Sequence, residues 1–378
     1  MGVDEMLQAI HECGPRWAER AEQAERDGSI STDTASELRT LEVHRSLQPA
    51  EFGGLQDSFA THTRLIAAIA EYCASAAWCA SVWSAHNWMA GLFSPAGQSE
   101  LWADPTALIS ASIVPRTRFE TDGDDVLVRG RFGFASGCDH ADWLGVGGLI
   151  GDDSPTPGIC LLPAHEVGID ADSWNVIGLA GSGSKDLVID QPIRVPAHRV
   201  LRTPDAAARR APGQQGDDRV LYRAPFRATA IIVLAAPAIG LTKSSLRRFE
   251  ERLDGHLIVA QQASQRSDPA AALRLAESAA DAHAAELVLL DACHRLDRLA
   301  ATTDPDPVEV ASIARDAAYS VRLCATAVDR LYEASGGSAL RVDEPIQRYW
   351  RDVHAARSHA VLTWDGAAEA YAAAVLGG

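Results

Sequence analysis

The side chains best suited to chemistry gather at three places in this sequence. A run from Ser136 to His140 reads Ser-Gly-Cys-Asp-His, a glycine-rich run covers Gly181-Ser-Gly-Ser184, and two histidines, His354 and His359, lie near the C-terminus. Serine hydroxyls donate and accept hydrogen bonds, glycines let the backbone approach a ligand closely, and imidazole exchanges protons near neutral pH. The three runs therefore indicate hydrogen bonding to a bound small molecule and one proton transfer.

Two common kinds of site are not indicated. Gly181–Ser184 is no dinucleotide fingerprint, because no G-x-G-x-x-G joins a strand to a helix there. The seven cysteines are odd in number and scattered, and none forms a C-x-x-C pair. We therefore expect no metal site and no disulfide framework, but the buried thiols of a cytoplasmic protein.

Composition excludes some partners. The 378 residues include 34 Lys and Arg against 51 Asp and Glu, a formal charge of −17, so nucleic acid is not an expected partner. No apolar run reaches the roughly 18–20 residues of a membrane span. The N-terminus also lacks a basic stretch followed by an apolar one, so no secretory signal is expected.

The pattern of residue types along the chain changes twice, which predicts three domains. Residues 1–105 are expected to be helical, residues 106–220 to be rich in strands, and residues 221–378 to form a helical bundle. In the first, helices are predicted over Met6–Arg26, from a cap at Ser31 or Thr32, and over Leu65–Ala80. In the second, Asp125–Arg129 and Leu187–Asp190 are typical strands between turns.

In the third predicted domain, long alanine-rich segments with helical periodicity alternate with Pro and Gly residues that interrupt helices. Helices are predicted over Ala230–Arg252, Pro269–Arg298, Pro307–Ala334 and Tyr349–Leu376. Four long helices with short connections indicate an antiparallel four-helix bundle.

This order, together with five local motifs, resembles the acyl-CoA dehydrogenase superfamily along almost the whole chain. The motifs are Pro49-Ala-Glu-Phe-Gly-Gly54, Gly130–Gly137, Trp174–Asp186, Val195-Pro-Ala-His-Arg199, and the pair Gly336-Gly with Arg351-Asp. The resemblance implies an α+β fold: an N-terminal helical domain, a central β-barrel or sandwich, and a C-terminal four-helix bundle.

Other residues resemble the monooxygenase branch of that superfamily. Ser136-Gly-Cys-Asp-His-Ala-Asp-Trp143 is similar to its S-G-x-x-H-A/S-x-W signature, and His86-Asn-Trp88 is similar to phenol hydroxylases. The stretch Arg351–Ala360 carries histidines where dehydrogenases often have a catalytic glutamate. The resemblance thus implies the oxygenase component of a two-component flavin monooxygenase, as in 4-hydroxyphenylacetate hydroxylases and antibiotic-pathway hydroxylases.

The resemblance also implies a mechanism and partners. A separate flavin reductase supplies reduced FMN or FAD, O2 forms a C4a-hydroperoxyflavin, and one oxygen passes to a small aromatic or phenolic substrate, in natural-product biosynthesis or aromatic catabolism. The family further implies a homotetramer, with a dimer as the fallback. No NAD(P)H fingerprint is visible, which agrees with delivery of flavin already reduced.

Site residues follow from the same resemblance. Ser136 is expected to hydrogen-bond the flavin and His359 to act as the base. His354 lies five residues earlier, so on one helix the two rings would point about 140° apart, and His359 is nearer the family's catalytic position. Further flavin contacts are expected from Ser112, Phe134, Gly183, Ser184 and Arg227, and substrate contacts from His86, Trp88 and His354.

A purely structural role is the alternative for four of these residues. Ser136 also fits a turn serine, Ser112 a strand serine, His86 a core histidine and Arg227 a solvated arginine at a helix start. Rival functions are N-oxygenation of an amine or amino sugar, ordinary acyl-CoA dehydrogenation, and a non-enzymatic scaffold.

Overall fold

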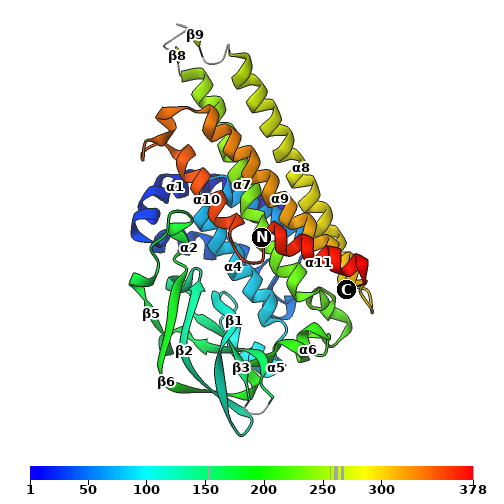
Figure 1. The fold of residues 1–378 in the computed structure, drawn as a ribbon. Helices are drawn as coiled ribbons and strands as arrows, with labels where there is room; N and C mark the ends of the chain where they lie inside the picture. Colours follow the sequence, from blue (N-terminus) through cyan, green and yellow to red (C-terminus); the bar gives the residue numbers. More distant parts are fainter. Residues whose placement is uncertain (152–153, 256, 259–262, 265–267, 378) are drawn as a thin grey trace.

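The computed structural model describes all residues except 152–153, 256, 259–262, 265–267 and 378. Figure 1 shows helices at the start of the chain, a twisted sheet, and a long helical bundle. The fold is the expected α+β fold, with strands between two helical parts. The division into domains at residues 105 and 220 stays a prediction.

The N-terminal helices are α1 (Val3–Asp27), α2 (Thr32–Thr40), α3 (Phe59–Ala70), α4 (Ala74–Ala90) and α5 (Pro95–Leu101). Ser31 caps α2, because its hydroxyl accepts a hydrogen bond from the Thr34 N–H at 3.2 Å. The turn after Pro49 is a short 3-10 helix that ends at Gly53, whose φ of 82° favours glycine.

The single helix predicted over Leu65–Ala80 is wrong. The helix α3 ends at Ala70, and Cys73 is extended (φ −149°, ψ 108°) before α4 begins. No Gly or Pro marks this corner, and apolar residues continue through it, so periodicity gave no signal. Tertiary packing sets the corner instead: the Tyr72 ring lies against Gly14 of α1, and the Ser244 hydroxyl of α7 (Phe226–Gly255) donates to the Glu71 carbonyl at 2.5 Å.

Seven strands form one sheet in the order β5-β6-β2-β1-β3-β4-β7. They are β1 (Ile109–Asp122), β2 (Asp125–Ala135), β3 (Trp143–Ile150), β4 (Thr156–Pro163), β5 (Gly168–Asp170), β6 (Lys185–Val195) and β7 (Val200–Arg202). From Ile109 to Phe119, β1 pairs with β3 in parallel, with a register shift between Ser112 and Thr117, and its last residues pair with β2. The two parts of the sheet share one apolar core, which includes Phe119, Leu144 and Leu187.

The C-terminal helices are α7 (Phe226–Gly255), α8 (Pro269–Ala300), α9 (Pro307–Ala334), α10 (Pro345–Arg357) and α11 (Trp364–Leu376). A short helix α6 (Thr203–Ala207) precedes them, and β8 (Leu257–Ile258) pairs with β9 (Ala263–Ser264) at the far end of the bundle. Within the described residues, α7 is the one helix apolar and long enough for a membrane, over Phe226–Leu253, but 83% of its most apolar window is buried inside the protein.

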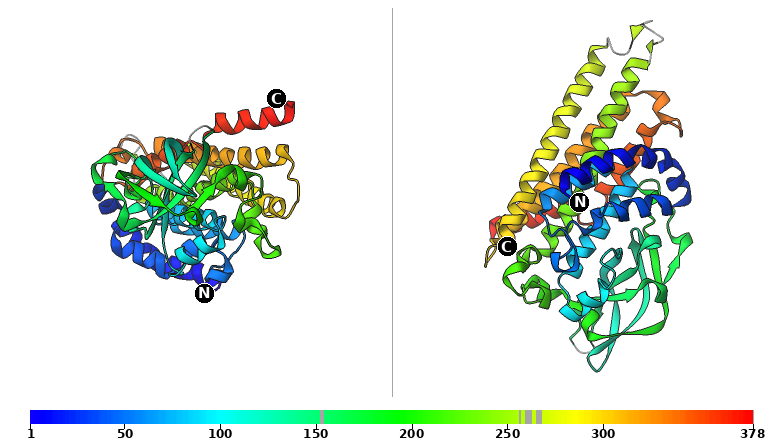
Figure 2. Two further views of the ribbon diagram at one scale, coloured as in Figure 1. Left: turned by 90° about the horizontal axis from the view of Figure 1, so that it is seen from below. Right: turned by 180° about the vertical axis from the view of Figure 1, so that it is seen from behind.

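The single helix predicted over Tyr349–Leu376 is also wrong. The chain leaves the helix after Arg357 and re-enters it at Trp364. The second helix, α11, packs on α9 along the outside of the bundle (Figure 2), where Arg315 lies 4.1 Å from the Tyr371 ring centre. To reach that position the chain must turn. The turn between the two helices carries His359.

Candidate active site

A buried cluster of hydroxyls lies where β2 ends. Ser136 directly follows β2, and its Oγ lies 2.6 Å from the Ser184 Oγ, which in turn lies 2.9 Å from the Ser182 Oγ. The indole N–H of Trp78, on α4, donates to the Ser136 Oγ at 3.0 Å. Since the Ser136 oxygen already accepts this bond, its own proton is available to Ser184 or to a ligand.

The backbone around this cluster is fixed from several sides. The Ser110 hydroxyl donates to the Ser136 carbonyl at 2.7 Å, and the Gly137 N–H donates to the Ser182 carbonyl at 2.8 Å. The Ser112 hydroxyl, expected to face a flavin edge, donates to the Gly133 carbonyl at 2.6 Å. Both β1 serines thus brace the end of β2, and Ser112 retains oxygen lone pairs for a further donor.

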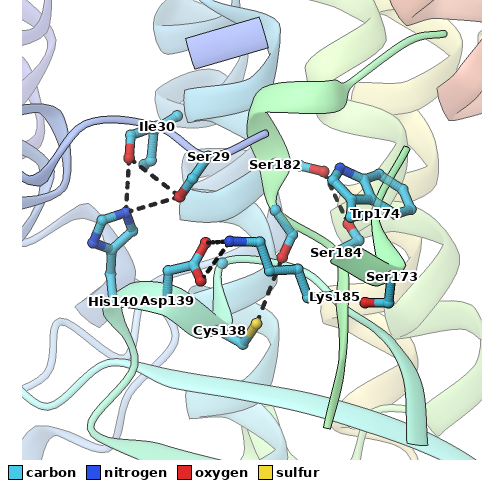
Figure 3. A network of polar contacts seen from close by, with 12 residues as sticks. Ser29, Ile30, Cys138, Asp139, His140, Ser173, Trp174, Ser182, Ser184 and Lys185 are labelled. Atoms are coloured by element: carbon cyan, nitrogen blue, oxygen red, sulfur yellow. Dashed lines mark hydrogen bonds and ion pairs between the residues drawn. The ribbon is translucent and has the colours of Figure 1, made fainter. Parts of the chain in front are cut away.

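Figure 3 shows how two segments, residues 138–140 and 182–185, are tied together and to the N-terminal helices. Lys185 forms an ion pair with Asp139 at 2.7 Å, and His140 Nε2 contacts the Ile30 carbonyl at 2.9 Å. Gly183 has a φ of 54°, and a Cβ there would come within 2.8 Å of the Asp139 Oδ2. Glycine is therefore required at 183 on both conformational and steric grounds.

Phe134 presents an apolar surface beside the cluster. Its side chain is 69% exposed although it is large and apolar, and its φ of 68° is left-handed. Such backbone costs roughly 1–2 kcal/mol for a residue other than glycine and collects at ligand sites. Trp174 meets the Phe134 ring edge-on at 6.1 Å, and Ile177 nearby in the chain is 74% exposed.

These features fit an isoalloxazine ring. Its flat faces need apolar contact, which the exposed Phe134 offers, and its polar edge needs hydrogen bonds, which the Ser136–Ser184 hydroxyls offer. A flavin here would be held by the end of β2 and by the loop 174–184.

That loop is anchored by α10. The Leu179 N–H donates to the buried Asp352 Oδ1 at 2.6 Å, and Arg351 donates to the Ile177 carbonyl. Leu179 is itself left-handed (φ 51°), and Gly178 lies directly against the Arg351 carbonyl. Burial raises the pKa of Asp352 to about 6. The helix that leads to His359 therefore also holds the loop that carries Ser182 and Ser184.

His359 lies off the helix, two residues beyond the end of α10. Its ring centre is 5.7 Å from the Trp78 ring, and the Val361 N–H points at its Nδ1 from 3.4 Å. Burial lowers the pKa of His359, which favours the neutral imidazole. Trp78 thus contacts both residues predicted to be catalytic, with its ring toward His359 and its N–H on Ser136.

His354 faces elsewhere. Its Nε2 lies 2.7 Å from the Asp329 carboxylate of α9, and its ring packs on Trp350 at 4.8 Å. The premise that His354 and His359 share one helix is wrong, because α10 ends at Arg357. The rings nevertheless diverge, since His354 turns into the bundle and His359 turns toward Trp78.

Of the two residues of α4 expected to contact the substrate, His86 is half-buried and Trp88 is buried. The His86 Nδ1 lies 3.2 Å from the Ile109 carbonyl, and burial lowers the pKa of His86 to about 4. The neutral ring therefore donates through Nδ1 and leaves Nε2 as an acceptor. Trp88 is 3% exposed, donates to the Leu221 carbonyl at 3.0 Å and packs on Phe226, as a core residue does.

Arg227 is not brought to the serine cluster. It lies exposed in the first turn of α7 and lines a pocket together with residues of α6, of the segment between α6 and α7, of α9 and of α11. Its predicted contact with the flavin stays a prediction.

Sequence reasoning missed the roles of two residues of the site: Trp78 and Asp352. Trp78 shares a stripe of α4 with Val82 and His86 at four-residue spacing, a signal that was present but looked like core. Asp352 belongs to one of the family motifs, but its role in anchoring a loop could not be predicted, because its partner Leu179 is distant in sequence.

Comparison with known proteins identifies the family. The pattern described as acyl-CoA dehydrogenase, C-terminal domain, matches residues 232–364. The oxygenase subunit HsaA of a flavin-dependent monooxygenase from Mycobacterium tuberculosis is 34% identical, covering 94% of this chain and 91% of that protein. The oxygenase component of the FADH(2)-dependent resorcinol hydroxylase from Rhizobium sp. is 30% identical, covering 94% and 90%.

A solved structure agrees. The crystal structure of 3-HSA hydroxylase from Rhodococcus sp. RHA1 superposes with a TM-score of 0.92 at 30% identity, over 99% of this chain and 97% of that one. With the acyl-CoA dehydrogenase fold and the hydroxyl cluster in place, this chain belongs to the oxygenase components of the flavin-dependent monooxygenases.

Proposed function

We propose that this chain hydroxylates a small phenolic substrate, using O2 and reduced FMN or FAD that a separate flavin reductase supplies. The observation that carries the proposal is the contact of Trp78 with both Ser136 and His359, beside the exposed Phe134. A hydrogen-bonding hydroxyl and a neutral imidazole therefore both lie against the Trp78 indole, and the exposed Phe134 lies two residues before Ser136 in the chain.

When bound, the reduced flavin supplies the oxygen-transfer chemistry. The Ser136 hydroxyl would donate a hydrogen bond to the polar edge of the bound ring, and Phe134 with the backbone at Gly183 and Ser184 would hold the ring. His359 removes the phenol proton, which raises electron density at the carbon to be hydroxylated. A neutral imidazole can accept that proton, and burial keeps His359 neutral.

The same geometry speaks against dehydrogenation of an acyl thioester. The only carboxylate in Arg351–Ala360 is Asp352, and its Oδ1 accepts the Leu179 N–H inside the protein. No free carboxylate in this stretch is left to abstract a proton next to a thioester. We further propose that the protein is a cytoplasmic homotetramer that meets its reductase only transiently.

A single-turnover experiment tests the function. The protein is mixed anaerobically with chemically reduced FMN or FAD, then with O2 and a panel of phenols and amines. The proposal expects a hydroxylated phenol in proportion to the flavin supplied. Amine oxidation without phenol oxidation would favour N-oxygenation. Reduction of bound oxidised FAD by an acyl-CoA would show a dehydrogenase.

A further inference from the structure

The structure has a pocket between α6 and the helices α7, α9 and α11. It has a volume of about 380 Å³, is partly open to solvent, and is lined by α6, the segment from Arg209 to Pro225, the first turns of α7 and α9, and α11. None of its lining residues belongs to the group formed by Ser136, Ser184 and His359. A cavity of this size is large enough for a small organic ligand.

The charge of its wall is unusual for this chain. The lining contains the three arginines Arg209, Arg223 and Arg227 and no Asp or Glu, although acidic residues outnumber basic ones by 51 to 34 in the whole sequence. The remaining lining residues are Ala, Pro and Val. The helix α7 also begins at this wall, and its N-terminal end adds positive potential, whereas the N-terminal end of α9 is capped by the Asp306 carboxylate.

Two of the arginines donate to backbone carbonyls, and among the described residues neither forms an ion pair. Arg209 donates to the Leu299 carbonyl at 3.1 Å at the end of α8, and Arg223 donates to the Gln214 carbonyl at 3.1 Å. Burial and then the nearby charge of Arg223 lower the pKa of Arg209, with Asp304 acting in the opposite direction as a smaller influence. Arg209 also has left-handed backbone, with a φ of 57°.

We propose that this cavity binds a small organic anion. The arginines would hold a carboxylate or phosphate, and the wall formed by alanines of α9 and α11 would hold the apolar remainder of the ligand. Such a ligand relieves the repulsion between Arg209 and Arg223 and meets the exposed guanidinium of Arg227 at the rim. The anion is either the charged end of the substrate or a separate small molecule.

Binding is measured first on flavin-free protein by calorimetry, with benzoate, phenyl phosphate and the neutral benzamide as probes. The two anions should bind at least tenfold more tightly than benzamide. Arg227→Ala should weaken benzoate binding by about tenfold or more. Ala311→Glu, which puts a carboxylate on the half-buried wall of α9, should abolish it.

The matched control is Arg210→Ala. Arg210 is an exposed neighbour that pairs with Asp205 at 3.1 Å and does not line the cavity, so its loss removes the same charge from the protein. It should bind benzoate like the wild type. Equal binding of benzoate and benzamide, or an equal loss in Arg210→Ala and Arg227→Ala, would overturn the proposal. So would loss of reduced-flavin binding in Ala311→Glu, because the cavity would then be part of the flavin site.

Steady-state kinetics distinguish an anion that is part of the substrate from one that is a separate molecule. If the anion is part of the substrate, Arg227→Ala should raise KM for a phenolic carboxylate and leave KM for its neutral methyl ester unchanged. If the anion is a separate molecule, both KM values should stay unchanged while benzoate binding is still lost. The binding measurements use neither flavin nor O2, so they succeed or fail independently of the proposed hydroxylation.

Discussion

His359 is the residue whose replacement separates substrate chemistry from flavin chemistry. If it removes the phenol proton, His359→Ala should leave reduced-flavin binding intact and lower product formation by roughly 10²–10⁴-fold. Oxygen should then be consumed with release of H2O2. Because burial lowers the pKa of His359, wild-type coupling of oxygen to product should persist as the pH falls to the ordinary histidine value of 6.5. Product and H2O2 are measured in the same reaction.

The control for His359 is His354→Ala. His354 pairs with Asp329 on α9 and faces away from Trp78, so its loss should leave the ratio of product to H2O2 as in the wild type. If His354→Ala released H2O2 instead of forming product while His359→Ala still formed product, the base would be His354 and not His359.

Replacement of Ser136 should change the reaction in a different way from replacement of His359. Ser136→Ala removes the hydroxyl that links the Trp78 N–H to Ser184, and with it the proton offered to the flavin edge. We expect H2O2 release to rise even without substrate, and a buried indole N–H left unpaired costs about 1–3 kcal/mol of stability. Ser110→Ala is a matched loss of a buried hydroxyl that touches only the Ser136 carbonyl. Equal H2O2 release from both variants would contradict a direct role for Ser136.

At the scale of elements, α10 positions the loop 174–184 through Asp352. Asp352→Ala leaves the Leu179 N–H without its acceptor and should weaken reduced-flavin binding by about tenfold. Asp352→Asn keeps an oxygen in place and should retain most of the affinity. Equal loss in both variants would mean that the carboxylate charge, rather than the anchoring of the loop, is needed.

The same residue predicts a dependence of stability on pH. Burial raises the pKa of Asp352 from 3.8 to about 6, so between these values the folded protein holds a proton that the unfolded chain releases. Its contribution to stability therefore falls as the pH rises through this range, by about 3 kcal/mol in total. Asp352→Asn should gain stability relative to the wild type between pH 4 and 6, in urea unfolding. A constant difference across this range would contradict the shift.

At the scale of the whole molecule, exposed apolar side chains favour self-association. Leu273 and Leu287 of α8 are 62% and 56% exposed, and Ala367 is the one buried residue of the apolar helix α11. Burial of such surface between identical subunits is the usual route to closed oligomers. We expect a tetramer in light scattering at micromolar concentration. Leu273→Glu with Leu287→Glu should shift it to smaller species, and a wild-type monomer would contradict this assembly.

The sequence by itself determined the order of elements and the family. Helix α9 was predicted over Pro307–Ala334 and has those bounds, because Pro at its first position and the Asp306 cap are local signals. The motifs around Ser136 and Arg351 are likewise local, and the relatives confirm the monooxygenase branch that they indicated.

Tertiary structure decided where apolar helices turn and which side chains meet. No Gly or Pro marks the turn after Arg357 that frees His359, and α11 is placed by its packing on α9. The partners Trp78 and Ser136, or Asp352 and Leu179, are far apart in sequence and meet only when the helical parts close on the sheet. Local patterns record backbone preference, whereas contacts between distant segments depend on how the elements pack.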